Sequence, residues 1–351
     1  MKAVILVGGE GTRLRPLTYD LPKPMVPICG KPFMEYQLHL MKEHGINEVI
    51  FSLGYKWKVF EDHFADGADI GMKLHYVVED SPLGTAGAIK NVEDYLDEDT
   101  FCVFNGDILS DFNLQEIFKI HARMNAKCTI ALTPVEDPTL YGLVELDGQG
   151  KILRFTEKPK REDVRSNLIN AGFYVLDRSI LNKMIRGKNY SIEREIFPEA
   201  LKRGEMLVGY SHSGYWLDIG SPLKYITANY DVLQSRLKSP ASPTAQRHVA
   251  PDAIIGENVS ITEPVWIGNG VKIEDGSRII GPTVIGDYCT VGESSLIERS
   301  VLWPGSSIGN NCSLEEVIVG RYCSIGDKTA LGGLSVIGSY NVIVSTKSPE
   351  E

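Results

Sequence analysis

The sequence predicts two successive folds, an open α/β sheet followed by a parallel β-helix. From Met1 to Lys238, short apolar runs alternate with amphipathic stretches of helical period. Residues 239–250 are rich in Pro, Ser and Ala and read as a linker between two domains. From 251 to 345, dipeptides of an aliphatic residue and glycine, such as Ile267-Gly268 and Ile285-Gly286, recur, and several of the intervals between them are six residues or multiples of six. This period is typical of a parallel β-helix, in which each coil buries its aliphatic residues on the next.

The predicted α/β domain has six clear strands and four clear helices. Each expected strand is short, apolar and rich in β-branched or aromatic residues. The expected strands are Lys2–Val7, Val49–Leu53, Leu74–Val78, Phe101–Phe104, Thr129–Thr133 and Ile169–Leu176. The expected helices are Phe33–Glu43, Ala86–Tyr95, Leu114–Met124 and Ser191–Lys202. Ser191 is a candidate N-cap of the last helix. Residues 346–351 are expected to form a short tail.

Composition narrows the class of protein. A chain of 351 residues with 43% hydrophobic and 23% charged residues suits two ordinary globular domains. The net charge of −10 argues against a nucleic-acid partner. Because no apolar run reaches membrane-spanning length, we expect a cytoplasmic protein without a membrane partner. The six cysteines contain no C-x-x-C pair, so neither a zinc site nor a disulfide framework is expected.

A glycine-rich, basic segment follows the first expected strand directly. The run Ala3–Val7 leads into GGEGTRLRP, and LPKP follows a few residues later. Glycines allow the backbone to approach an anion closely, and bare N–H groups in such a loop bind phosphate. Arg13 and Lys23 add positive charge where a phosphoryl transfer develops negative charge. The spacing matches neither a P-loop nor the dinucleotide-binding motif.

The two basic clusters carry a family resemblance. LVGGEGTRLRPLT followed by PKPMVPICGKP resembles the signature of the sugar-nucleotide pyrophosphorylases, which are nucleotidyltransferases. The resemblance implies a Rossmann-like open mixed sheet of the nucleotide-diphospho-sugar transferase type, and a left-handed β-helix for the repeats. It also implies nucleotidyl transfer to a sugar 1-phosphate, with Arg13 and Lys23 as catalytic residues. The nucleotide contacts that it implies are Leu6, Gly8, Gly9, Gly11, Thr12, Arg13, Glu79, Pro82, Gly84 and Thr85.

Two aspartates are candidate metal ligands. Asp107 lies in F-N-G-D after an expected strand, and Asp218 lies in Y-W-L-D-I-G. Two carboxylates together with substrate phosphates are what Mg²⁺ usually takes. An aspartate after a strand is also commonly a helix cap or turn residue, which is the alternative for Asp107. The resemblance favours Mg²⁺, since aspartates of these two motifs hold the metal in the family.

The sugar 1-phosphate is expected to bind the E-K-P motif that follows the apparent strand Lys151–Phe155. In the family this motif places its lysine, here Lys158, on the phosphate, and its glutamate, here Glu157, on a sugar hydroxyl. Gly142 and Asn170 match two further sugar-contacting positions, and Asp107 is also expected to bind the sugar phosphate.

Glu79 bears on the identity of the base. Thymidylyl- and uridylyltransferases of this superfamily typically have glutamine at the matching place. A carboxylate only accepts hydrogen bonds, so it suits the two adjacent donors of guanine and not the carbonyls of thymine or uracil. In the alternative interpretation, Glu79 is a surface strand residue that points elsewhere. Together the motifs resemble mannose-1-phosphate guanylyltransferases with a β-helix tail, which implies GTP and mannose 1-phosphate as substrates and GDP-mannose as product.

Three other interpretations stay open on these residues. The first is a glucose-1-phosphate thymidylyl- or uridylyltransferase, whose motifs are nearly superposable. The second is a non-catalytic regulatory subunit, although the charged catalytic positions are all present. The third makes the β-helix an acetyltransferase, but all seven histidines precede residue 251, so the usual base is missing. We therefore expect the β-helix to mediate homo-oligomerisation.

Overall fold

The computed structural model describes residues 1–344, and the chain folds into two compact units. The first unit comprises residues 1–10 and 37–216, and the second comprises residues 11–36 together with residues from 217 onward. The glycine-rich segment therefore passes from one unit to the other between Glu10 and Gly11. The domain boundaries expected at residues 238 and 251 stay a prediction, and the expected tail lies outside the described residues.

The first unit is built on one mixed sheet of nine strands. The strand order is β10-β9-β11-β6-β1-β4-β5, with β8 pairing with β11 and β12 pairing with β8. The strands are β1 (Lys2–Val7), β4 (Glu48–Leu53), β5 (Lys73–Val78), β6 (Thr100–Asn105), β8 (Cys128–Pro134), β9 (Gly142–Leu146), β10 (Ile152–Glu157), β11 (Leu168–Asp177) and β12 (Leu207–Ser211). Strands β1, β4, β5 and β6 run parallel, whereas β11 is antiparallel to β6, β8 and β9. The open mixed sheet expected from the sequence is thus confirmed.

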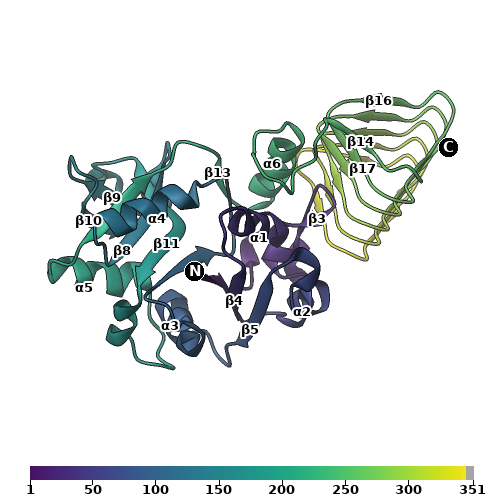
Figure 1. Ribbon diagram of the computed structural model, residues 1–351. Coiled ribbons are helices and arrows are strands. Elements are labelled where there is room, and N and C mark those ends of the chain that lie inside the picture. Colours follow the sequence, from purple (N-terminus) through teal and green to yellow (C-terminus); the bar gives the residue numbers. More distant parts are fainter. Residues whose placement is uncertain (345–351) are drawn as a thin grey trace. The chain divides into compact units, whose positions relative to one another are not determined.

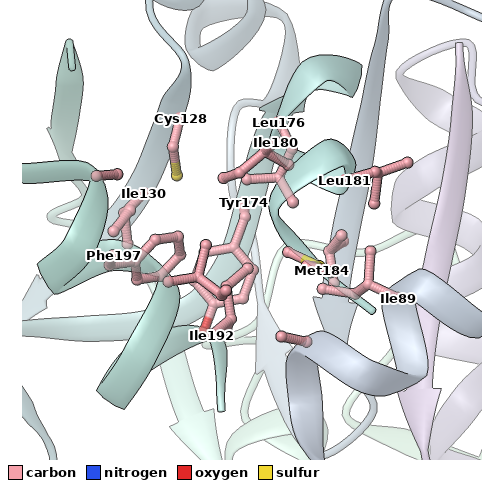
Figure 2. Close-up of a cluster of buried hydrophobic side chains, with 14 of the residues drawn as sticks. Ile89, Cys128, Ile130, Tyr174, Leu176, Ile180, Leu181, Met184, Ile192 and Phe197 are labelled. Carbon is pink, nitrogen blue, oxygen red and sulfur yellow. The ribbon is translucent and has the colours of Figure 1, made fainter. Parts of the chain in front are cut away.

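Helices pack on this sheet and close the core. They are α2 (Lys58–Phe64), α3 (Gly84–Asn91), α4 (Leu114–Arg123), α5 (Phe197–Lys202) and most of α1 (Phe33–Glu43), with a π-helix at Ile192–Ile196 before α5. Figure 2 shows the core cluster beside the fully buried ring of Tyr174, with aliphatic side chains from several elements around it. The helix expected at Ser191–Lys202 is therefore present but begins as a π-helix, and Ser191 caps it by accepting a hydrogen bond from Arg194 N.

The parallel strands end along one edge of the sheet. The register pairs Val7 with Leu53 and Leu53 with Val78, while Leu6 pairs with both Ser52 and Asn105. Gly8, Glu79 and Asp107 follow the ends of these strands. In open α/β sheets ligands bind outside the carboxyl ends of the strands. This edge is therefore the place to look for a site.

The second unit is dominated by a β-helix of short parallel strands in three sheets, visible in Figure 1 as a stack of coils. The first sheet contains β14 (Arg247–Val249), β17 (Val265–Ile267), β20 (Thr283–Ile285), β23 (Val301–Leu302), β26 (Ile318–Val319) and β29 (Val336–Ile337). The second contains β15 (Ile254–Ile255), β18 (Lys272–Ile273), β21 (Thr290–Val291), β24 (Ser307–Ile308), β27 (Ser324–Ile325) and β30 (Val342–Ile343). The third contains β16 (Ser260–Thr262), β19 (Arg278–Ile280), β22 (Leu296–Glu298), β25 (Ser313–Glu315) and β28 (Ala330–Leu331). Hydrogen bonds between coils join residues 17 or 18 apart, which is three sides of about six residues each.

Part of the expected linker belongs to this β-helix. Residues 247–249 form β14, which pairs in parallel with β17. The inward-facing aliphatic residues of successive coils form one continuous buried cluster, as the repeat predicts.

The second unit also contains helix α6 (Pro222–Leu233) and residues 11–36. These residues form three short 3-10 turns, Thr12–Leu14, Leu17–Tyr19 and Lys23–Met25, and a small hairpin of β2 (Pro27–Ile28) and β3 (Lys31–Pro32). Figure 1 shows α6 and β3 next to the β-helix. Two outward-facing residues of the first β-helix sheet, Val301 and Ile318, are at most 1% exposed, so this face is covered. Among helices within residues 1–344, none has the length and hydrophobicity needed to cross a lipid bilayer.

Candidate active site

Glu79 and the glycine loop meet at the end of β1. A Cβ at Gly8 would come 3.4 Å from Oε1 of Glu79, so the carboxylate lies against the backbone of the loop. Oε1 accepts a hydrogen bond from the buried Ser52 hydroxyl at 3.0 Å, and Oε2 accepts one from Leu83 N at 3.1 Å. Glu79 is half-buried and fixed in direction, which argues against an unconstrained surface residue.

The other expected nucleotide contacts in the first unit surround this pair. Leu6 is half-buried near the end of β1, and Gly9 is exposed beyond it. Pro82 is exposed in the loop before α3, and Gly84, the first residue of α3, is also exposed. The hydroxyl of Thr85 is already engaged, because it donates to Glu193 Oε2 at 2.7 Å and accepts from Ile192 N at 2.8 Å. Thr85 therefore connects α3 to the π-helix.

Asp107 follows β6 at the same edge. It is half-buried, and the turn before it depends on Gly106, where a Cβ would stand 2.3 Å from Val7 Cγ1 and 2.8 Å from Leu6 O. Only glycine permits this close approach of the two strand ends. Asp107 is not a helix N-cap, since β7 (Ile108–Ser110) follows it.

The sugar-side residues Gly142 and Glu157 are cross-strand partners. The register of β9 and β10 pairs them directly, and a Cβ at Gly142 would come 2.9 Å from Glu157 Oε2. The missing side chain makes room for the carboxylate. Burial raises the pKa of Glu157 above its ordinary value, and the charge of Glu193 acts in the same direction. Glu157 ends β10, so the strand runs further than the sequence predicted.

Lys158 leaves the strand in a left-handed conformation, with φ of 48°. Its N–H donates to Tyr141 O at 2.9 Å, and its side chain is exposed. Non-glycine residues with positive φ are uncommon and often lie at functional sites. Lys158 is thus exposed, whereas Glu157 beside it is half-buried.

Asn170 begins a chain of polar contacts that the sequence did not reveal. Its Nδ2 donates to the Tyr174 hydroxyl at 2.7 Å, which in turn donates to Glu193 Oε1 at 3.2 Å. Burial is the main cause of the raised pKa of Tyr174, and the Glu193 charge adds to it. Asn170 Oδ1 also accepts from Gly172 N. Both ends of the amide are thus oriented.

Glu193 is the functional candidate that sequence analysis missed. Its carboxylate accepts hydrogen bonds from the hydroxyls of Thr85, Tyr174 and Ser191, so it joins the expected nucleotide side to the expected sugar side. It lies in the π-helix, a feature that occurs frequently at functional sites. The signal in the sequence is an acidic residue two positions after the Ser191 cap.

In the second unit, the absence of a side chain at Gly11 lets Lys23 pack closely against the glycine-rich segment. Gly11 has φ of 64°, and a Cβ there would stand 3.0 Å from Lys23 Cβ. Its carbonyl accepts from the Thr18 hydroxyl at 2.9 Å. Lys23 is 8% exposed, whereas Thr12 and Arg13 are exposed on the first 3-10 turn. The two expected catalytic cations therefore differ in exposure to solvent.

Asp218 and Arg13 both approach Gly220 within this unit. A Cβ at Gly220 would lie 2.9 Å from Asp218 Oδ2 and 3.5 Å from the two Nη atoms of Arg13. Asp218 is 8% exposed and forms an ion pair with Lys224, a further cation that sequence analysis missed. Within residues 1–344, no group of three or more His, Cys, Asp and Glu forms a protein-only metal cage.

Comparison with known proteins decides the family. The family model described as nucleotidyl transferase matches residues 2–235. The chain belongs to the nucleotidyl transferase family. Residues 245–348 of this nucleotidyltransferase match the model of the EIF2B subunit epsilon LbH domain, and the three parallel sheets are those of a left-handed β-helix.

Relatives of this nucleotidyltransferase are named for the transfer of nucleotides with different bases. The chain is 37% identical to mannose-1-phosphate guanylyltransferase of Mycobacterium tuberculosis, over 89% of this chain and 82% of the relative. It is 34% identical to UTP--glucose-1-phosphate uridylyltransferase of Synechocystis, over 94% and 89% respectively. Among solved structures, HddC from Yersinia pseudotuberculosis complexed with GMP-PN is 31% identical, with a TM-score of 0.55 over 65% of this chain and 97% of that one.

Proposed function

We propose that this nucleotidyltransferase joins GTP to mannose 1-phosphate, giving GDP-mannose and pyrophosphate. Glu79 carries the proposal for the base. Each of its carboxylate oxygens has one protein donor and so retains a lone pair, and the carboxylate lies against the backbone of the glycine loop. Guanine presents two adjacent donors that suit such a pair of acceptors, whereas uracil and thymine would bring carbonyl oxygens against it.

Overall similarity does not select the base, because identities of 37% and 34% to a guanylyl- and a uridylyltransferase are nearly equal. Two observations add support for guanine. The relatives include a mannose-1-phosphate guanylyltransferase catalytic subunit beta of Danio rerio, 35% identical over 99% of both chains. The name of the ligand in the HddC complex, GMP-PN, denotes a guanine nucleotide. The preference for mannose rests on these relatives alone.

The proposed reaction needs no protein nucleophile. An ionised oxygen of the sugar 1-phosphate attacks the α-phosphorus of GTP, the bond from that phosphorus to the bridging oxygen breaks, and pyrophosphate leaves with the electron pair. The chain contributes positioning and neutralisation of the developing charge. Arg13 and Lys23 would act on the triphosphate, and Lys158 on the phosphate of the sugar 1-phosphate.

The sugar ring is proposed to bind beside the contact between Gly142 and Glu157. The cleared space at Gly142 leaves Glu157 facing that position, and Asn170 is oriented by Tyr174 and Glu193. A carboxylate and an amide supply acceptors and donors for hydroxyl groups. Glu193 would link recognition of the sugar to Thr85 at the start of α3.

Mg²⁺ is the proposed cofactor. Nucleotidyltransferases of this family typically use a divalent metal. The candidate donors in this chain, Asp107 and Asp218, are carboxylates, which is the ligand type that Mg²⁺ takes together with phosphates and water. When bound, Mg²⁺ would neutralise charge on the triphosphate and orient it. Lys224 pairs with Asp218 and offsets its charge.

The experiment that tests the proposed function is pyrophosphate release by the full-length protein with Mg²⁺. GTP, dTTP, UTP and ATP are each combined with mannose 1-phosphate and with glucose 1-phosphate. We expect the highest kcat/KM with GTP and mannose 1-phosphate. A higher value with dTTP or UTP and glucose 1-phosphate would overturn the assignment of base and sugar. Nucleotide binding by calorimetry without turnover of any pair would favour a regulatory subunit.

We also propose that the β-helix mediates self-association. Its first sheet is covered by segments of its own chain, so the other two sheets and the ends would carry the contact. Ile254 is 59% exposed and Val342 is 67% exposed on the second sheet. Light scattering after size-exclusion chromatography tests this, and a mass equal to that of one chain across the working concentration range would refute it.

A further inference from the structure

The segment from Pro16 to Gly30 runs lengthwise along the β-helix. As the residue number within this segment increases, the residue number of its partner in the β-helix decreases. Pro16 lies against Gly338, Asp20 pairs with Arg321, and Gly30 lies against Trp266. Pro27 is linked to Trp303 through the Tyr225 hydroxyl. These partners occupy four different coils. Residues 16–30 are therefore held by several coils of the β-helix and not by a single one.

One end of this segment is held by the late coils. The Nε of Arg321 lies 3.3 Å from Oδ2 of Asp20, and the two side chains are 31% and 25% exposed. One coil further on, a Cβ at Gly338 would come 2.9 Å from Pro16 Cβ, so the absence of a side chain lets the loop pack closely there.

The other end is held by buried aromatic contacts. The indole N–H of Trp303, which is 1% exposed, donates to the Tyr225 hydroxyl at 2.8 Å, and that hydroxyl donates to the carbonyl of Pro27. A Cβ at Gly30, which has φ of 78°, would come 2.8 Å from Trp266 Nε1. This end is therefore a packed and hydrogen-bonded junction.

Lys23 lies between the two ends of the segment that the β-helix holds, and Gly11 lies just before the first of them. Lys23 stands between Asp20 and Pro27 in the chain, and its Cβ faces Gly11. Thr18, between Pro16 and Asp20, donates to the carbonyl of Gly11. A shift of Asp20 would thus be passed to Gly11 and Lys23 through short and direct contacts.

We propose that the β-helix holds residues 11–25, the catalytic loop, in position. In this proposal Arg321 is a positioning residue for nucleotidyl transfer and acts through Asp20. The proposal rests on the proposed function, because it assigns the loop cations to the transferred phosphates. It gives the β-helix a part in turnover that self-association alone does not require.

The partial exposure of the Arg321–Asp20 pair predicts that its removal should change kcat more than stability. The Arg321–Asp20 pair is a quarter to a third exposed, so its loss should cost less free energy of unfolding than the loss of a fully buried ion pair. Misplacement of reacting groups by a fraction of an ångström, in contrast, lowers rates strongly. Loss of Arg321 should therefore reduce kcat while the melting temperature and the KM for sugar phosphate stay close to native values.

The test compares Arg321→Ala, Arg321→Lys and Asp20→Asn in the full chain with Arg278→Ala as the matched control. Arg278 is an exposed arginine of the third sheet, outside this junction. We expect kcat to fall by about tenfold in Arg321→Ala and Asp20→Asn, and to recover in part in Arg321→Lys. The double variant Arg321→Ala/Asp20→Asn should be no slower than either single variant, because both remove one interaction. Native kcat in Arg321→Ala, or an equal loss in Arg278→Ala, would overturn the proposal.

A second measurement keeps the proposal separate from the proposed function. Hydrogen exchange of the amides of residues 11–25 should be faster in Arg321→Ala than in native protein, and unchanged in Arg278→Ala. If the native protein shows no turnover, the proposed function fails, and exchange still tests whether Arg321 holds the loop. Unchanged exchange in Arg321→Ala would refute the proposal that the β-helix holds these residues in position.

Discussion

The carboxylate of Glu79 lies against Gly8, with Oε1 3.4 Å from the position that a Gly8 side chain would take. The two residues come from the ends of strands that are separated in the sheet only by β4. Ser52, at the end of β4, donates to the same oxygen. Three neighbouring strands thus fix one acceptor at the loop where we propose that the base binds.

Removal of the Ser52 hydroxyl should reduce base selectivity. In Ser52→Ala the Glu79 carboxylate loses one of its two orienting donors, and the kcat/KM ratio of GTP over UTP should fall by about two- to tenfold. Ser277→Ala is the control, since Ser277 is an equally buried serine in the β-helix. An unchanged ratio in Ser52→Ala would show that the contact does not matter for base recognition.

Filling the space at Gly142 should weaken sugar binding. The new methyl group of Gly142→Ala would come 2.9 Å from Glu157 Oε2 and 2.8 Å from the Phe155 ring, so the carboxylate must move. We expect the KM for mannose 1-phosphate to rise by about tenfold or more while the KM for GTP changes little. Gly148→Ala, where nothing lies within 4 Å, provides the control. If both variants bind sugar phosphate alike, Glu157 does not contact the sugar.

Glu157 should also leave a signature in the pH dependence of stability. Because burial raises its pKa, the folded state keeps this proton to a higher pH than the unfolded state does. Stability due to Glu157 is therefore present below the ordinary carboxyl pKa of about 4.3 and is lost as the pH rises through the raised value. The melting temperature of native protein relative to Glu157→Gln should thus decline from pH 4 to 7. A rise over this range would mean that the fold stabilises the carboxylate.

The cysteines should be unreactive in the folded protein. All six are buried and free, and burial raises the pKa of the Cys29, Cys102 and Cys128 thiols, so few thiolates are available. A thiol reagent should label none of them within minutes under native conditions and all six after denaturation. Fast labelling of any one in native protein would contradict the described packing.

Most elements of the fold follow from local patterns in the sequence. Helix α1 begins and ends where its period predicts, and the strands β1, β4 and β5 agree to within one residue, because buried parallel strands are short apolar runs. The coils follow from the repeat. The path of residues 16–30 along the β-helix was not predictable, because it depends on contacts between segments about 300 residues apart, such as Asp20 with Arg321.

Sequence motifs mark one part of the candidate site, and the polar side chains that act through other residues carry no such mark. Glu79, Gly142 and Glu157 stand in motifs, and the structure gives each a defined neighbour. Ser52 looked like any strand residue, and Glu193 looked like a residue of a helical first turn. Their importance comes from hydrogen bonds made across the sheet and between α3 and the π-helix.

The measurement that tests the central claim most directly is the base preference of Glu79→Gln beside that of native protein, with pyrophosphate release from GTP, dTTP and UTP as the readout. An amide both donates and accepts, so this change removes the mismatch with pyrimidine carbonyls and weakens the match with guanine. We predict that native protein prefers GTP and that the variant loses at least about tenfold of this preference. Native preference for dTTP or UTP, or a GTP preference that Glu79→Gln leaves intact, would contradict the account.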